Sequence, residues 1–364
     1  MAKKIFIAAT MQNDGKTTVS LGLISVLKKH FNKIGFIKPI GQRYLIEQGY
    51  KVDEDSVLIE EVFGIKCNIK DMSPVAIEKG FTERYIQKGP EEDYSKLIKD
   101  SFERVAKNND LVIIEGTGHA GVGSVFDLSN AAVAKLLGAN VILISSGGIG
   151  RPIDEVMLNK PLFDKEGVKI AGIIVNKVLP EKYDKVARLV RMGLEKKGLS
   201  VLGVLPYQKI LDMPTVRDIK EELNLELLLG GENLDLAVEK ILVGAMNVKE
   251  AIKFIQNNSL MIIPGDRDDM IRAISEIHTS KLKRCCRISG MVLSGGLIPV
   301  GRTRRILEKS KIPVLISEDD TYSVASAVHH ILVKLKPQDT AKIKIIVDIV
   351  EKNIDIDNVL ASLT

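Results

Sequence analysis

The chain has 364 residues, which is enough for two or three domains of about 100–200 residues each. Hydrophobic residues make up 45% and charged residues 27%, a globular composition that excludes a disordered chain or a fibrous repeat. There is no Trp, only 4% of residues are aromatic and the net charge is +5, which excludes a nucleic-acid-binding protein with stacking rings. We therefore expect no nucleic-acid partner, and buried strands built from aliphatic residues.

Cysteine usage and apolar runs indicate the cellular compartment. The cysteines are Cys67 and the adjacent Cys285 and Cys286, an odd number without metal-ligand spacing, so neither a disulfide framework nor a zinc site is expected. The apolar run at residues 5–9 is too short for a secretory signal, and no segment approaches the run of about 20 apolar residues of a membrane helix. The sequence predicts a cytoplasmic protein without a membrane partner.

Short apolar runs that alternate with amphipathic segments organise residues 1–211. The apolar runs predict buried β-strands at residues 5–9, 34–37, 111–114, 141–144, 170–175 and 201–204. The amphipathic segments predict helices at residues 19–29, 96–107, 130–137 and 182–197. Parallel strands need long connections, which helices provide, so this alternation predicts an α/β domain with a doubly wound, mainly parallel sheet.

A second, smaller α/β domain is predicted at residues 212–337, because an aperiodic stretch with Pro206 and Pro214 interrupts the pattern. Helices are expected there at residues 215–223, 236–241, 251–256, 270–277, 303–310 and 323–335. Strands are expected at residues 260–263, 290–293 and 314–316. Residues 338–364 keep the apolar spacing of a helix and are expected to form a helical tail.

A phosphate-binding loop is the strongest motif in the chain. Gly15, Lys16 and Thr17 stand between an apolar run and a helical segment, which is the context that such a loop requires. Backbone N–H groups would face the phosphates, the lysine would add a positive charge and the threonine hydroxyl would bind Mg²⁺. The residues expected at the nucleotide are Thr10, which replaces the usual first glycine, with Asn13, Gly15, Lys16, Thr17 and Thr18. The alternative is a lysine in an ordinary loop.

An acid, Glu115, ends the apolar run that starts at residue 111, and a glycine follows it. Ligands bind beyond the carboxyl ends of parallel strands, so this carboxylate is expected beside Thr17. Together they would form an oxygen-rich Mg²⁺ site. The alternative is an acid that caps a turn.

With these motifs, residues 1–211 resemble the dethiobiotin-synthetase-like branch of the P-loop proteins. Further segments match that branch in order: residues 36–41 with Lys38, 53–56 with Asp55, 173–177 with Asn176 and Lys177, and 202–207. The whole chain resembles the non-acetyltransferase portion of long bacterial phosphate acetyltransferases, in which a DRTGG domain follows the P-loop domain.

The resemblance implies that Lys16 and Lys38 are catalytic groups. It implies that Thr17, Asp55 and Glu115 are Mg²⁺ ligands. It also implies that Asn176 and Lys177 contact the base of ATP or another nucleoside triphosphate. Enzymes of this branch use ATP to phosphorylate a carboxylate, so the implied partner is an unknown small carboxylate substrate. Catalysis would consist mostly of positioning and electrostatic stabilisation of the moving phosphoryl group.

Departures from the resembled families narrow the expected activity. Asn13 stands where dethiobiotin synthetases carry an acid, and residues 117–123 replace an aromatic-containing turn, which argues against a biotin precursor as substrate. An acetyltransferase domain would need about another 300 residues by ordinary domain sizes. We therefore expect that the chain is not an acetyltransferase.

Three predicted strand ends of the second domain resemble the DRTGG signature, at Asp266 and Arg267, at Gly295 and Gly296, and at Asp320. Strand ends on one edge of a parallel sheet form a crevice, and glycines permit the close approach of a ligand or a neighbouring subunit. The alternative, with equal weight, is that the charged residues only cap helices and pair with one another.

Two functions are expected from these observations. The first is a Mg²⁺- and ATP-dependent enzyme, an ATPase or a ligase-like protein. The second is a non-catalytic nucleotide sensor that acts through the DRTGG-like domain. Lys38 favours the enzyme, because a sensor has little need for a lysine on the acceptor side of the γ-phosphate. A homodimer is the default assembly.

Overall fold

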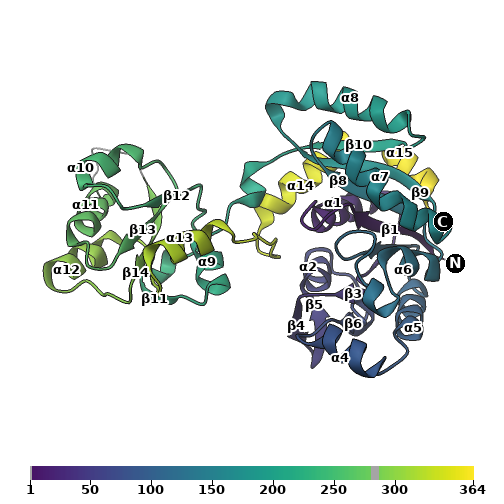
Figure 1. Ribbon diagram of the computed structural model, residues 1–364, viewed down its shortest axis with the longest axis horizontal. Helices are drawn as coiled ribbons and strands as arrows, with labels where there is room; N and C mark the ends of the chain where they lie inside the picture. The colour runs from purple at the N-terminus through teal and green to yellow at the C-terminus, as the bar shows by residue number, and fades with distance from the viewer. Residues whose placement is uncertain (1, 280–286) are drawn as a thin grey trace. The chain divides into compact units, whose positions relative to one another are not determined.

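The computed structural model describes residues 2–279 and 287–364, which form two compact units (Figure 1). Unit 1 contains the residues up to Gln208 together with Leu335–Thr364, and unit 2 contains Lys209–Lys334. The expected separate tail, residues 338–364, is thus part of unit 1. Cys285 and Cys286 lie outside the described residues.

Unit 1 is built on a six-stranded sheet in the order β10-β9-β8-β1-β7-β2, in which all neighbouring strands are parallel. The strands are β1 (Lys3–Ala9), β2 (Ile34–Ile37), β7 (Leu111–Glu115), β8 (Val141–Ser146), β9 (Ile170–Val178) and β10 (Val201–Pro206). Each contains one of the six apolar runs of the sequence. The predicted parallel α/β sheet is therefore confirmed, because fully apolar runs are the pattern of strands buried on both faces.

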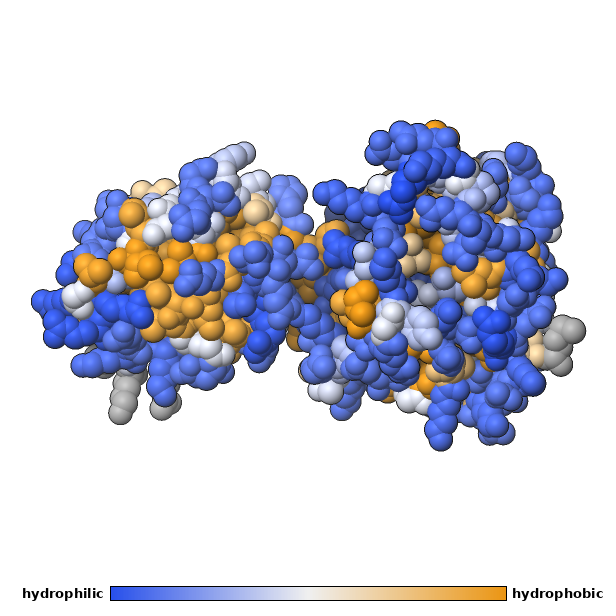
Figure 2. Space-filling model, turned by 90° about the horizontal axis from the view of Figure 1, so that it is seen from below, coloured by the Kyte–Doolittle hydropathy of each residue, from blue (hydrophilic) through white to orange (hydrophobic). Residues whose placement is uncertain are grey.

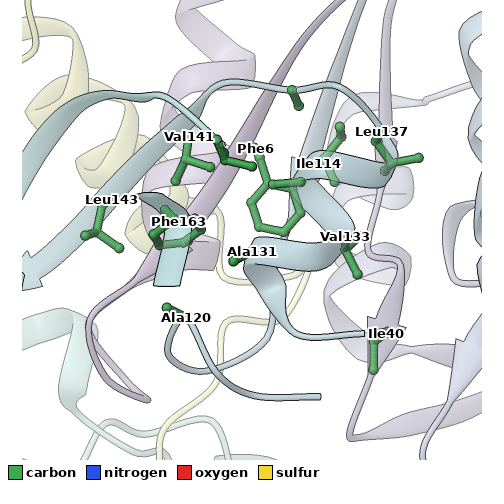
Figure 3. Packing of buried hydrophobic residues seen from close by; sticks show 14 of the residues in the cluster. Phe6, Ile40, Ile114, Ala120, Ala131, Val133, Leu137, Val141, Leu143 and Phe163 are labelled. Atoms are coloured by element: carbon green, nitrogen blue, oxygen red, sulfur yellow. The ribbon is translucent and has the colours of Figure 1, made fainter. Parts of the chain in front are cut away.

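The helices of unit 1 are α1 (Lys16–Leu27), α2 (Glu54–Phe63), α3 (Ile69–Met72), α4 (Phe81–Lys88), α5 (Tyr94–Ala106), α6 (Asn130–Leu136), α7 (Gly150–Lys165) and α8 (Tyr183–Glu195). One core cluster joins α5, α6, α7 and α8 to alternate residues of the strands. In Figure 3, Phe6 of β1 lies in this cluster with Ile114 and Val141 of other strands and Ala131 of α6. The sequence analysis missed α7, which has Pro161 in its interior.

Two small sheets stand beside the main sheet. The pair β3 (Ile40–Gly41) and β6 (Val75–Ala76) is parallel, and β4 (Tyr44–Glu47) and β5 (Tyr50–Asp53) form an antiparallel hairpin. Since α2 begins at the residue after β5, this hairpin fixes the position of the acidic segment 53–55.

The C-terminal helices α14 (Thr340–Asn353) and α15 (Ile356–Ser362) complete unit 1 (Figure 1). The α14 helix packs on α1 so closely that a Cβ atom at Gly22 would lie 2.3 Å from Val350 Cγ2. At the end of the chain, Thr364 and Lys4 exchange two main-chain hydrogen bonds. The last residues are thus joined to β1 and to the helix that follows the phosphate loop.

Unit 2 contains a five-stranded sheet in the order β11-β15-β14-β13-β12, parallel except for β11. The strands are β11 (Glu226–Leu229), β12 (Lys240–Val243), β13 (Ser259–Pro264), β14 (Ile288–Ser294) and β15 (Val314–Ile316). The helices are α9 (Val216–Glu222), α10 (Val248–Ala251), α11 (Asp268–Thr279), α12 (Gly301–Ser310) and α13 (Thr321–His329). Short 3₁₀ turns lie in both units, at Ser124–Phe126, Pro180–Lys182, Lys209–Asp212, Gly231–Asn233 and Ile252–Phe254.

The helix predicted at residues 236–241 is wrong, because β12 begins at Lys240 and pairs with β13. Its short apolar run fits either period, and the neighbouring strand decides between them. The sequence analysis also missed β11. Figure 2 shows hydrophobic surface on unit 2, where Leu297, Ile298 and Val300 are among the exposed large side chains. None of the helices that the structure describes combines the length and hydrophobicity that a membrane crossing requires.

Candidate nucleotide site

The loop between β1 and α1 has the backbone of a phosphate-binding loop. Gly15, the residue before the helix, has a φ of 96°, and Asn13 has a φ of 66°. A Cβ atom at Gly15 would lie 2.2 Å from Asn176 Nδ2, so only glycine fits there. Lys16 and Thr17 open α1, whose first turn carries neither an acid nor a side-chain cap. The N–H groups of this turn are therefore available to an anion.

A buried polar network holds the first half of the loop. Asp14 Oδ2 accepts hydrogen bonds from Thr10 Oγ1 at 2.8 Å and from the Met11 N–H at 2.7 Å. Asp14 Oδ1 accepts from the Ser146 hydroxyl, and Thr10 Oγ1 also lies 2.9 Å from Glu155 Oε2 of α7. The side chain of Thr10 is fully buried. Its main-chain N–H donates to the Ile144 carbonyl at 2.7 Å, and its carbonyl accepts from Asn159 Nδ2 at 3.1 Å, so Thr10 stabilises the loop through contacts within the protein.

Glu115, at the end of β7, lies beside Thr17 as predicted from the strand ends. The Thr17 hydroxyl donates to Glu115 Oε1 at 3.1 Å. Burial raises the pKa of the fully buried Glu115 carboxyl to about 7, although the Lys38 ammonium and the nearby Ser20 hydroxyl lower it. Its other oxygen, Oε2, has no hydrogen-bond partner within bonding geometry among the described residues. This carboxylate thus has capacity left for a ligand.

Lys38 follows β2 and lies in a cluster of carboxylates. Its Nζ is 3.0 Å from Asp53 Oδ1 and 3.5 Å from Glu115 Oε1, and it also contacts Asp55 Oδ2. Burial alone would lower the pKa of this ammonium, but Asp55, Glu115 and Asp53 together raise it well above its ordinary value. Burial raises the pKa of Asp53 in turn. The sequence analysis singled out Asp55 of this pair of aspartates and did not assign Asp53.

Lys16 reaches across to the segment after β7. Its Nζ donates to the Gly118 carbonyl at 3.3 Å, and burial lowers the pKa of the ammonium. The Gly118 segment is held by Asn130, whose side chain bonds the main chain of Thr117 and of His119. The phosphate-loop lysine therefore closes over the site, and a phosphate would compete with the carbonyl for it.

The two residues predicted at the nucleotide base lie at the end of β9. Asn176 is buried and uses its side chain within the protein, donating from Nδ2 to the Asp14 carbonyl at 2.9 Å and accepting the Lys177 N–H at Oδ1. Lys177 has a φ of 59°. Thr18 lies in the first turn of α1. The structure thus brings the predicted residues of unit 1 to the carboxyl edge of one sheet.

The oxygen atoms of Thr17 and Glu115 have the chemistry that Mg²⁺ prefers, and within the described part of the chain Glu115 Oε2 has no hydrogen bond of good geometry. Among the described residues there is no cluster of three or more His, Cys, Asp or Glu side chains that would hold a metal by itself. Mg²⁺ at nucleotide sites needs only one or two carboxylates besides phosphates and water, so these residues fit that ion.

The predicted residues of unit 2 lie at the ends of β13, β14 and β15. Arg267 pairs with Asp269 at 2.9 Å and donates to the Gly244 carbonyl at 3.1 Å, whereas Asp320 caps α13 by accepting the Tyr322 N–H at 2.8 Å. Asp266 is exposed. Gly295 and Gly296 have positive φ values of 80° and 65°. Arg267 thus pairs with a charge and Asp320 caps a helix, which are the roles expected if these residues do not bind a ligand.

The profile of a family described as an AAA domain, AAA_26, matches residues 3–215, more than half of the chain. The chain belongs to the AAA_26 family. The profile of the DRTGG domain matches residues 218–331 of this AAA_26 protein. The predicted combination of a P-loop domain and a DRTGG domain is therefore confirmed.

Curated relatives match nearly the whole of this AAA_26 chain. A phosphate acetyltransferase of Nitratidesulfovibrio vulgaris is 26% identical over 98% of the chain and 51% of its own length. One of Pseudomonas putida is 28% identical over 96% of the chain and 50% of its own length. The chain thus spans about half the length of the curated relatives it matches. These matches confirm the predicted resemblance to long phosphate acetyltransferases.

Solved structures match the chain at low similarity. A ParA family ATPase of Chlorobium tepidum matches with a TM-score of 0.37 and 13% identity, over 61% of this chain and 88% of its own. The CBS and DRTGG domains of a Clostridium perfringens pyrophosphatase match with a TM-score of 0.26 and 16% identity, over 43% of this chain and 76% of theirs.

The relatives correct the predicted function. The sequence analysis expected an ATP-dependent enzyme or a nucleotide sensor and excluded an acetyltransferase. That exclusion is contradicted, because relatives that match 96–98% of the chain are named phosphate acetyltransferases. The error came from treating the length of one sequence as a limit on activity, although the relatives are about twice as long.

Proposed function

We propose that this AAA_26 chain acts in a phosphate acetyltransferase, in which it holds a Mg²⁺-bound nucleoside triphosphate, ATP or another. The observation that carries the first part is the match of 98% of the chain to a relative of that name. The phosphate loop and the carboxylate beside it support the second part. The proposal also includes a homodimer in the cytoplasm.

The residues of unit 1 place positive charges and N–H donors where the phosphates of a nucleotide would bind. The N–H groups at the start of α1 and the Lys16 ammonium would bind phosphate oxygens. Thr17 and Glu115, with Asp55 nearby, would hold Mg²⁺, which when bound would offset the charge of the phosphates. Lys38 would supply the second cation on the far side of the terminal phosphate.

The base of the nucleotide would lie at the end of β9. The side chain of Asn176 is committed to the phosphate loop, so the main chain around Lys177 is proposed as the contact instead. This is a change of role from the sequence expectation, since the amide fixes the loop that holds the phosphates.

Two measurements on the purified protein test the proposal. The first follows formation of acetyl phosphate from inorganic phosphate and acetyl coenzyme A. If no acetyl phosphate forms, the acetyltransferase part of the proposal is wrong.

The second measurement is calorimetric titration with Mg²⁺-ATP and Mg²⁺-GTP. Lys16→Ala should weaken binding by about 1–3 kcal/mol, the scale of a charge-assisted hydrogen bond. The matched control is Lys197→Ala, at an exposed lysine after α8. Equal binding by both variants would remove the nucleotide part.

A further inference from the structure

The carboxylate of Asp53 has two partners on a single oxygen. Asp53 Oδ1 accepts the Asp55 N–H at 3.0 Å, which caps the start of α2, and it lies 3.0 Å from Lys38 Nζ. The residue is 3% exposed. One buried oxygen therefore joins the lysine after β2 to the helix start that carries Asp55.

The position of Asp53 is fixed from two sides. Its main-chain N–H donates to Ser73 Oγ at 2.9 Å. On the other side, a Cβ atom at Gly41 would lie 2.6 Å from Asp53 Cβ and 2.7 Å from Oδ2. The carboxylate thus fills the space that the glycine leaves, and it has little freedom to turn toward solvent.

The carboxylates around Lys38 differ in their burial. Lys38 contacts three of them, on Asp53, Asp55 and Glu115, and the Lys16 ammonium also acts on Glu115. The side chains of Asp53 and Glu115 are 3% and 0% exposed, whereas that of Asp55 is 21% exposed. A buried charge without a counter-ion is costly, so the inner aspartate and the ammonium stabilise each other, and Asp55 is the carboxylate nearest to solvent.

We propose that Asp53 is a positioning residue that remains the counter-ion of Lys38 while Asp55 exchanges the ammonium for the Mg²⁺ of a bound nucleotide. The inference rests on the proposed Mg²⁺-nucleotide site. An aspartate that only caps α2 would need no charge, since an asparagine oxygen also accepts the Asp55 N–H. The contact with the Lys38 ammonium, in contrast, depends on the negative charge of the Asp53 carboxylate.

The test compares the full-length wild type with Asp53→Asn, which keeps the size and the cap of the side chain and removes its charge. The matched control is Asp93→Asn, at an exposed aspartate that caps α5 by accepting the Lys96 N–H at 2.9 Å. Mn²⁺ replaces Mg²⁺ so that electron paramagnetic resonance reports bound metal directly. Calorimetry measures ATP affinity with Mg²⁺ and with EDTA, and thermal unfolding reports folding.

Asp53→Asn should weaken Mn²⁺ binding in the presence of ATP about tenfold, because Asp55 must then stay with Lys38. Affinity for metal-free ATP should be unchanged or higher, since the cluster has lost a negative charge. Asp93→Asn should leave both affinities at the wild-type values. In a Lys38→Met background, adding Asp53→Asn should cause no further loss of metal. This double variant buries no unpaired charge at these two positions, so the proposal can still be tested with it if Asp53→Asn alone folds poorly.

The outcomes separate this inference from the proposed function. Three results would each overturn the positioning role. The first is that Asp53→Asn binds Mn²⁺ as tightly as the wild type, and the second is that it loses ATP affinity equally with and without metal. The third is a further tenfold loss of Mn²⁺ affinity when Asp53→Asn is added to Lys38→Met. If the wild type itself binds no Mn²⁺ with ATP, the proposed nucleotide site fails and this inference fails with it.

Discussion

The side-chain amide of Asn176 donates a hydrogen bond to the main-chain carbonyl of Asp14 across 2.9 Å, and so joins the end of β9 to the phosphate loop. A Cβ atom on Gly15 would come within 2.2 Å of the same nitrogen. The glycine therefore serves two purposes, a left-handed backbone and space for the amide. This relationship between β9 and β1 makes the shape of the loop depend on a residue more than 160 positions away.

We expect Gly15→Ala to destabilise the protein and to weaken ATP binding. A left-handed backbone costs an L-residue about 1–2 kcal/mol, and the clash with Asn176 adds to this strain. The control is Gly198→Ala, at a φ of 73° with no atom within 4 Å of the added Cβ, which carries the strain without the clash. Thermal unfolding and calorimetry measure both effects. Equal loss of stability in the two variants would show that the amide contact is unimportant.

Thr17→Val should lower nucleotide affinity only when metal is present. The valine keeps the shape of the side chain but loses the hydroxyl that donates to Glu115 Oε1 at 3.1 Å. The expected loss is about 1–2 kcal/mol, or about tenfold, in titrations with Mg²⁺-ATP. Thr17→Ser should restore affinity because it restores the hydroxyl. A valine variant that binds Mg²⁺-ATP like the wild type would remove Thr17 from the metal site.

Sequence reasoning found the parts of the site that lie next to one another along the chain. The apolar runs located the strands, and the rule for parallel sheets then predicted Glu115 beside Thr17, whereas Lys38 was predicted from the family resemblance. The strand and Glu115 predictions need only local patterns.

Residues that act through distant partners were not found. Asp14 and Glu155 both contact the buried hydroxyl of Thr10, and the sequence near either residue does not indicate this. Asp55 was chosen over Asp53 because it aligns better with the resembled family, and the contact of Asp53 with Lys38 depends on how the β4–β5 hairpin folds back. For Asn176, the position was predicted but the direction of its amide was not.

Gly22→Ala should destabilise unit 1 by about 1–3 kcal/mol, the usual effect of overpacking. The added methyl would lie 2.3 Å from Val350 Cγ2, at the contact of α1 with α14. Val350→Ala leaves a cavity by itself, but in the double variant it makes room for the methyl. The free energies of unfolding should therefore be non-additive, with the double variant more stable than the sum predicts. Strict additivity would mean that the two helices are not packed together in solution.

Unit 2 should lose stability in mild acid because of His278, near the end of α11. Its Nδ1 accepts the Ile288 N–H at 3.2 Å, which requires a neutral ring. Burial, and then the charge of Arg287, lower the pKa of this imidazole below its ordinary value of about 6.5. The unfolded chain therefore binds the proton more tightly than the folded one, so the contribution of His278 is fully present above about pH 6.5 and is lost as the pH falls through the lower folded value. His278→Asn keeps an acceptor and removes the titration. Hydrogen exchange at β14 between pH 7.5 and 5.5 should show larger destabilisation in the wild type than in this variant, and parallel pH profiles would contradict the assignment.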